Sequence, residues 1–224
     1  MTRGEMDYTQ RVLATIRPSG IVGGRLLYEE NFEDFIVHGY ISDSGFSLTR
    51  TQGEVWRGAQ SGKLTSTDAH LAELMVSYIV PTPRFISTEI IFRPLDGNLR
   101  DFGLTYVIRD PTTQHLPLIW VRWDGSHLKL EATDSTYTDQ VMATVGTLTF
   151  AQYWHILYCR LDLAAKKYTK VQFDNTVVTK GLPTYPTTTL ASSPAGYVDI
   201  ETFSMPSTTN NTAIDDLYIT YEEP

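Results

Sequence analysis

The sequence has a single cysteine, Cys159, in 224 residues. One cysteine excludes an intrachain disulfide, so burial and hydrogen bonding must stabilise the fold. No apolar run approaches the roughly 18 to 20 residues of a membrane span, and the first twenty residues lack the apolar stretch of a signal peptide. We therefore expect a soluble chain without a membrane partner, and its cellular location stays unknown.

Positive charge is also scarce. The chain has 18 Lys and Arg residues against 26 Asp and Glu residues, which gives a formal net charge of -8. A nucleic-acid backbone and an anionic membrane surface would both repel such a chain. We expect no nucleic-acid partner.

Several catalytic motifs are missing. The stretch from Gly58 to Leu64 is superficially similar to a phosphate-binding loop, but its glycine spacing is too short and Leu64 replaces the required hydroxyl. Cys159 and His155 share a strand face, yet four residues separate them by roughly 13 Å, too far for a nucleophile and its base. We predict that Cys159 is a small buried apolar residue.

Short apolar segments separated by turns run along most of the chain, and helical periodicity is nearly absent. In the clearest segment, Leu157, Cys159 and Leu161 alternate with outward-facing neighbours, which is the pattern of a half-buried strand. Asp124 and Gly125 mark the clearest hairpin turn. Strands are predicted at 25–28, 46–48, 54–57, 72–80, 84–93, 102–109, 116–123, 127–132, 155–162, 168–173, 176–178, 196–203 and 213–221.

These segments predict an all-β fold, a two-sheet antiparallel β-sandwich. Glycine and proline residues before position 25 separate a short N-terminal arm, residues 1–24, from a single domain, residues 25–224. The Thr- and Pro-rich stretch 181–194 is predicted to be a long loop or an edge segment.

Three stretches carry a family resemblance. Trp154 and His155 lead one strand, and the sequence Lys-Tyr-x-x-Val-x-Phe-Asp follows at 167–174; this resembles the central hairpin of concanavalin A-like (lectin/glucanase, laminin-G-like) jelly rolls. LLYEENFEDF at 26–35 resembles their opening strand, and AIDDLYITYEEP at 213–224 resembles their closing strand. The resemblance implies a jelly roll over nearly the whole chain.

The laminarinase-like members of this superfamily, which this chain resembles, carry their catalytic carboxylates on an E-x-D-x-E strand upstream of the Trp-His strand. The corresponding stretch here reads LPLIWVRWDGSHLKLEA, and its acids Asp124 and Glu131 are isolated in the sequence. Glycoside hydrolysis requires two carboxylates at a fixed separation. We therefore expect a non-catalytic binding module, with carbohydrate as its partner.

One strand face carries two acids. Tyr197, Asp199, Glu201 and Phe203 share a face in the segment 196–203, and the two acids lie roughly 6.6 to 7 Å apart at their Cα atoms. This separation suits a hydrolytic pair or acceptors for sugar hydroxyls. The alternative, which the frequency of acids at such positions favours, is a solvated outer face with ordinary surface acids.

Trp120 and Arg122 form a second candidate site. They share a strand face, whereas Trp123 takes the opposite one. An exposed indole beside a guanidinium could stack on a sugar ring and bond its hydroxyls, and burial of both rings is the alternative. Further side chains that could join this surface are Glu89, Arg93, Tyr106 and Arg109.

The resemblance also implies a structural calcium that joins the first strand to the last. The matching acids are Glu30 and Asp215, with Asp216 and Asp34 in reserve. Calcium needs six or more oxygen ligands, which backbone carbonyls of nearby loops could complete. Outward-facing acids without a metal are the alternative.

Three functions remain open from the sequence. The first is carbohydrate binding without catalysis, and the second is a polysaccharide hydrolase or lyase that uses Asp199 and Glu201. The third is a structural or assembly protein of a surface or virion, in which the N-terminal arm and the stretch 181–194 make contacts within a homo-oligomer. Fold resemblance by itself does not choose among them.

Overall fold

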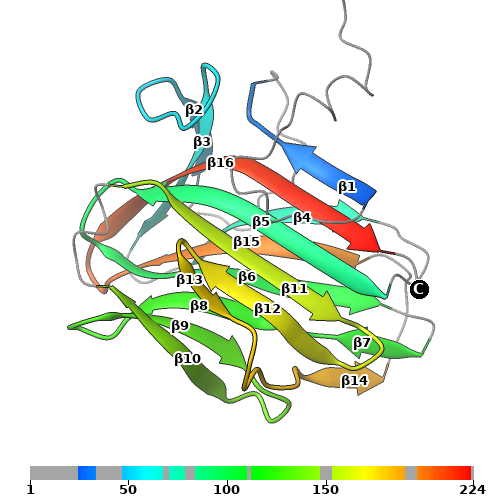
Figure 1. Ribbon diagram of the computed structural model, residues 1–224. Coiled ribbons are helices and arrows are strands. Elements are labelled where there is room, and N and C mark those ends of the chain that lie inside the picture. Colours follow the sequence, from blue (N-terminus) through cyan, green and yellow to red (C-terminus); the bar gives the residue numbers. More distant parts are fainter. Residues whose placement is uncertain are drawn as a thin grey trace, which may run out of the picture.

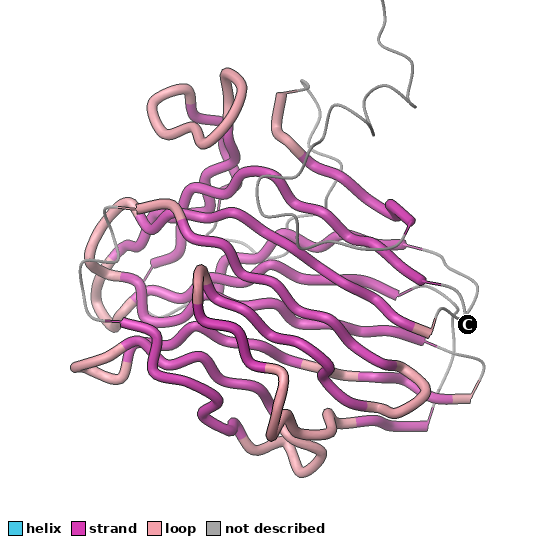
Figure 2. The backbone as a smooth tube through the Cα atoms, viewed as in Figure 1, coloured by secondary structure: helices cyan, strands magenta, loops and turns pink. Residues whose placement is uncertain are grey.

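The computed structural model describes residues 25–33, 47–67, 71–78, 84–109, 112–146, 153–189 and 196–222. Figure 2 shows that these residues form strands and loops, and none of them lies in a helix. Accordingly, the described part of the chain has no helix that is long and apolar enough to span a membrane.

The strands form two sheets in which every pairing is antiparallel. Sheet A contains β1 (Arg25–Glu30), β2 (Ser47–Thr51), β3 (Ser61–Thr67), β5 (Phe85–Pro94), β11 (His155–Asp162), β12 (Lys167–Phe173), β13 (Thr176–Val178) and β16 (Thr209–Glu222). Sheet B contains β4 (Leu71–Tyr78), β6 (Leu99–Arg109), β7 (Thr113–His115), β8 (Leu118–Trp123), β9 (Leu128–Thr133), β10 (Asp139–Gly146), β14 (Thr187–Thr189) and β15 (Gly196–Ser204).

The two sheets lie one in front of the other in Figure 1, with sheet A toward the viewer and sheet B behind it. The order in sheet A is β13-β12-β11-β5-β16-β3-β2, with β1 also paired to β16. The order in sheet B is β10-β9-β8-β6-β15-β4, with β7 paired to β6 and β14 paired to β7. The predicted all-β, two-sheet antiparallel sandwich is confirmed.

The hairpin of β11 and β12 follows the predicted alternation. Leu157 pairs with Phe173 and Cys159 with Val171, and all four side chains are buried in the core. Cys159 is fully buried, and burial raises the pKa of its thiol to about 12. It is thus a neutral apolar residue at physiological pH, as the sequence predicts.

Aromatic rings join the two layers. Phe92 of β5 and Phe102 of β6 stack between the sheets with their centroids 3.7 Å apart, and the Phe92 ring also contacts Phe173 of β12. All three rings are buried, and each buried ring stabilises the fold by roughly 1.5 to 3 kcal/mol relative to an exposed one. The core is therefore formed by the inward-facing side chains, which are every second residue of each strand.

The turn between β8 and β9 is built as predicted. One carboxylate oxygen of Asp124 accepts the backbone N–H groups of Ser126 at 2.8 Å and His127 at 2.7 Å, while Gly125 adopts a positive φ of 97°. These hydrogen bonds lower the pKa of Asp124. The turn fixes the register that places Trp123 opposite Leu128.

Some predicted elements are wrong. Residues 54–57 belong to a loop rather than a strand, because the N–H groups of Trp56 and Arg57 donate to the carboxylate of Asp215 instead of a neighbouring strand. Strands β3, β7 and β10 are absent from the prediction. β3 is rich in Ser, Thr and Gly, and the side chains at the start of β10 are exposed, so neither shows a strong apolar alternation.

The predicted N-terminal arm, residues 1–24, lies outside the described residues, and the division into arm and single domain stays a prediction. In the stretch 181–194, Thr187–Thr189 form β14 at the edge of the fold, next to β7.

We predict that Gly103→Ala destabilises the protein. A Cβ at this position would lie 2.3 Å from Cε3 of Trp120 and 2.5 Å from the carbonyl oxygen of Ile119. Such overpacking costs about 1 to 3 kcal/mol. Urea denaturation measures the loss, and Gly97→Ala is the matched control because nothing lies within 4 Å of the Cβ it would add. Equal midpoints for the two variants would contradict the prediction.

Candidate functional site

The outer face of sheet B, which points away from sheet A, holds most of the predicted ligand-binding residues. On β15, Val198 and Ile200 point into the core, so Tyr197, Asp199 and Glu201 point outward. The predicted alternation of this strand is confirmed. Asp199 and Glu201 are both buried despite facing outward, so neither is an ordinary solvated surface acid.

The register brings Glu201 and Trp120 into one row. Glu201 pairs with Gly103 of β6, Gly103 pairs with Trp120 of β8, and Trp120 pairs with Glu131 of β9. Because Gly103 has no Cβ, the indole of Trp120 lies directly on the backbone of β6. Its edge meets the ring of Phe203 at a centroid distance of 5.8 Å.

Trp120 is only 7% exposed. The predicted separation of the two indoles is present, since Trp123 packs against the core from the opposite face of β8. Trp120 nevertheless offers little open area for stacking on a sugar. Its role on this face is to support Phe203 and Arg122, whose guanidinium carbon lies 5.9 Å from the indole centroid.

Arg122 of β8 is the centre of a charge network that joins this strand to three other strands of sheet B. Its guanidinium donates to Asp101 of β6 at 3.1 Å, to Glu131 of β9 at 2.7 Å and to Asp139 of β10 at 2.9 Å. Arg100 adds a second cation, 2.9 Å from Asp101. The Arg122 and Asp139 side chains are each about one-third exposed, so the network reaches solvent.

Burial and charge shift the pKa values in this network. Burial raises the pKa of Glu131, and Asp139 and Asp101 raise it further, whereas Arg122 opposes the shift. Burial alone would lower the pKa of Arg122, but its three carboxylate partners outweigh that effect and raise it. The network thus holds the Arg122 cation beside one buried acid, Glu131, whose pKa is raised.

Sequence reasoning found only part of this site. It identified Trp120, Arg122, Tyr197, Asp199 and Glu201, which share one sheet face, but it did not find Asp101 or Asp139. The prediction that Glu131 is isolated is wrong, because Arg122 binds it. No local spacing reveals these partners, since they come from separate strands whose pairing only the folded register fixes.

The further residues proposed for this surface do not all lie on it. Glu89 and Arg93 belong to β5, which is in sheet A, and Tyr106 is buried in the core. Arg109 ends β6 in sheet B. The prediction for Glu89 and Arg93 is wrong because the consecutive strands β5 and β6 belong to different sheets. It is wrong for Tyr106 because this residue lies on the inward face of β6, together with Leu104.

The acids proposed as calcium ligands lie where β1 pairs with β16 in sheet A. Glu30 pairs with Leu217, and one Glu30 oxygen accepts the N–H of Phe32 at 2.8 Å. One Asp215 oxygen accepts the N–H groups of Trp56 at 3.0 Å and Arg57 at 3.2 Å. Burial raises the pKa of Asp215 to about 6. The reserve ligand Asp34 lies outside the described residues.

Carboxylate oxygens are suitable ligands for a hard cation such as calcium, but these acids do not converge on one point. Glu30, Asp215 and Asp216 are all buried, and Arg57 lies 3.7 Å from Asp216. No group of three or more His, Cys, Asp or Glu side chains within the described ranges is placed to hold a metal ion. A calcium ion here would need backbone carbonyls and water for most of its ligands, and it stays a proposal.

Comparison with known proteins supports the fold. No protein-family model and no curated protein matches the sequence. The structure is similar to the endo-β-1,4-glucuronan lyase of the fungus Trichoderma reesei, with a TM-score of 0.60, 13% identity and coverage of 88% of this chain and 95% of that one. It is also similar to a carbohydrate esterase of the Shiga toxin-encoding bacteriophage phi24B, with a TM-score of 0.56, 16% identity and coverage of 82% and 90%.

A third similar structure is LamAcat of Zobellia galactanivorans, with a TM-score of 0.50, 11% identity and coverage of 88% of this chain and 98% of that one. These likenesses support the predicted β-sandwich fold. At these identities the likeness establishes the fold and leaves the activity open.

We predict that Arg122→Met destabilises the protein by about 1 to 3 kcal/mol at pH 7, because three carboxylates then face one another without their shared cation. The loss shrinks at pH 4, because Glu131, whose pKa is raised, takes up a proton and no longer repels its neighbours. Urea denaturation at both pH values measures it. Lys129→Met is the control, since the ion pair that Lys129 makes within the described residues is with Asp124, at 3.4 Å, and not with the three acids that Arg122 binds. A loss that does not depend on pH would contradict the prediction.

We predict a second pH effect from Asp215. Its folded pKa of about 6 exceeds the ordinary value, so its contribution to stability is greatest below pH 4 and declines as the pH rises through 6. The decline amounts to at most about 3 kcal/mol. Asp215→Asn removes this dependence and also weakens the fold, because an amide cannot accept all the N–H groups that Asp215 accepts.

Thermal melts of the wild type and of Asp215→Asn across this pH range test the effect. If calcium binds Glu30 and Asp215, it raises the melting temperature of the wild type above pH 6, and a chelator reverses the change. Identical dependence of melting temperature on pH in the two proteins would contradict the role of Asp215. A melting temperature that does not change when calcium is added would contradict the calcium site.

Proposed function

We propose that the protein binds carbohydrate through the outer face of sheet B and does not cleave it. The side chains of β8 carry this proposal. Its outward positions are Leu118, Trp120 and Arg122, and this is the stretch that corresponds to the acid-bearing strand of the catalytic relatives. A glycoside hydrolase needs carboxylates at such positions, whereas an indole and a guanidinium suit binding.

The polar groups of this face match the needs of a sugar. A carboxylate accepts hydrogen bonds from hydroxyls and a guanidinium donates to them. The network of Arg122 and Asp139 can therefore bind both the hydrogen and the oxygen of sugar hydroxyls. The half-buried rings of Tyr197 and Phe203 lie on the same face and provide apolar contact for the C–H groups of a pyranose.

The structural neighbours favour the same ligand class. Two of them are named as a glucuronan lyase and a carbohydrate esterase. A shared fold does not transfer their activities, but proteins that act on sugars use this scaffold, and the polar and aromatic face of sheet B gives the scaffold a surface suited to that ligand.

A polysaccharide lyase or hydrolase is the second candidate. The raised pKa of Glu131 beside Arg122 favours it, because a carboxyl group whose pKa is raised by burial is a candidate general acid. Asp199 and Glu201 remain the alternative acids. If the protein releases reducing ends or unsaturated products from a bound glycan, its function is catalysis and not binding alone.

A glycan array with the full chain tests the proposal. We expect binding to at least one glycan, and we expect Phe203→Leu and Arg122→Lys to weaken it by about tenfold, because they remove the flat ring and the planar donor fork. Val177→Ala is the control, because Val177 is exposed on β13 of the other sheet. An array without any bound glycan, or variants that bind like the wild type, would contradict the proposal.

A further inference from the structure

Two tryptophans meet at the surface of sheet A, away from the face proposed above. Trp56 lies in the loop between β2 and β3 and is 42% exposed. Its indole centroid is 6.1 Å from that of Trp154, and the ring planes are tilted by 58°. Tyr153, just before Trp154, is 59% exposed. Single exposed apolar residues are common, but exposed aromatic rings that lie together indicate a binding site.

The loop that presents Trp56 is fixed by two carboxylates. Asp215, which is fully buried, accepts the N–H groups of Trp56 and Arg57. Glu33 accepts those of Ala59 at 2.6 Å and Gln60 at 3.0 Å. The backbone that carries the exposed indole is therefore fixed before any ligand arrives, which reduces the entropy lost on binding.

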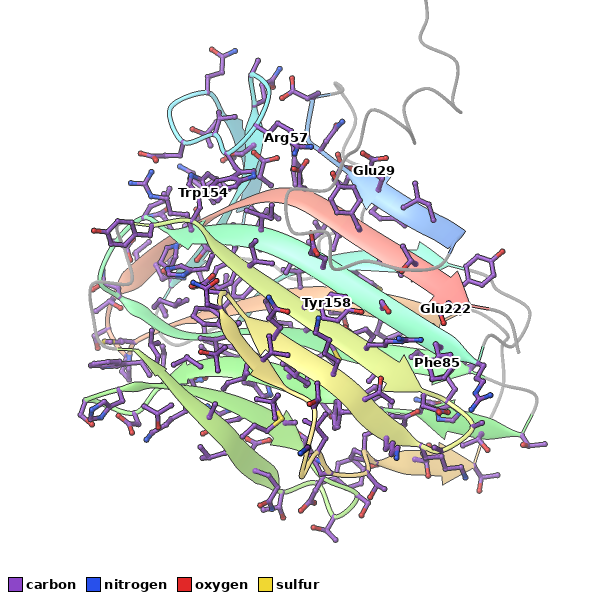
Figure 3. All side chains as sticks on the ribbon, viewed as in Figure 1. Glu29, Arg57, Phe85, Trp154, Tyr158 and Glu222 are labelled. Atoms are coloured by element: carbon purple, nitrogen blue, oxygen red, sulfur yellow. The ribbon has the colours of Figure 1, made fainter. Side chains whose placement is uncertain are left out.

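Polar groups surround the two indoles. Phe92 faces the core, so the next residue of β5, Arg93, points out of sheet A, where it forms an ion pair with Glu54 of the loop. His155 pairs with Phe92, which places Trp154 beside the position of Arg93. Figure 3 shows Trp154 and Arg57 at the same end of sheet A, near β3.

We propose that Trp56, Trp154, Glu54, Arg57 and Arg93 form a second carbohydrate-binding surface, here called the Trp56 patch, for a single neutral glycan chain. An indole presents a negative face to the C–H groups of a pyranose, while Arg93 and Glu54 can donate to and accept from its hydroxyls.

Charge and ring geometry select the ligand class. Arg93 faces Glu54 and Arg57 faces Asp216, so cations and carboxylates balance and nothing favours an anionic polymer. Two rings tilted by 58° cannot both lie flat on a planar surface. The Trp56 patch therefore suits one soluble chain of neutral sugars rather than a crystalline fibre or a polyuronate.

The Trp56 patch does not depend on the face of sheet B, because Trp56 and Phe203 belong to opposite layers. Affinity electrophoresis of the full chain in gels with hydroxyethyl cellulose, laminarin or xylan, and with polygalacturonate as the anionic probe, tests it. We expect retardation by at least one neutral glycan and about tenfold weaker binding of it by Trp56→Ala. Trp56→Phe keeps part of the binding.

A change in folding should not explain the loss of binding in Trp56→Ala. The loop is anchored through its backbone, so we expect this variant to melt near the wild-type temperature. Tyr137→Ala is the matched control, since it removes another exposed aromatic ring outside the Trp56 patch. If Phe203→Leu weakens the binding of a glycan and Trp56→Ala does not, the result supports the sheet B face and contradicts the Trp56 patch. Retardation by polygalacturonate alone, or by no glycan, overturns it as well.

Discussion

Phe92 and Phe102 stack between the two sheets, and every surface described above depends on that contact between layers. Each strand contributes alternate side chains to this interior, so the residues between them must face outward. Once Val198 and Ile200 of β15 enter the core, Asp199 and Glu201 are committed to the opposite face. The core thus decides which polar groups become available to a ligand.

The outer face of sheet B is organised around a glycine. The absence of a side chain at Gly103 lets the indole of Trp120 lie on the backbone of β6, between Glu201 on one side and Glu131 on the other. Arg122 then ties Asp101, Glu131 and Asp139 together. Close packing and charge pairing make this face rigid, which suits a binding surface whose groups must be in position beforehand.

Sheet A shows how one buried acid can serve two purposes. Asp215 lies at the junction of the first and last strands, where its burial raises its pKa to about 6, and its carboxylate also fixes the loop that presents Trp56. Protonation of Asp215, or a cation bound beside it, therefore bears on both the stability of the sheet edge and the placement of the exposed indole.

The sequence by itself determined the all-β class, the β11 and β12 hairpin and the inward side of β15, because a period of two is a local property of the chain. It also indicated that Trp120 and Arg122 share a face. Only the tertiary structure decided that Arg122 meets acids from three strands, that Glu89 and Arg93 lie in the other sheet, and that Trp56 meets Trp154. Those contacts join residues distant in sequence, and the pairing of strands and the packing of layers set them rather than any local pattern.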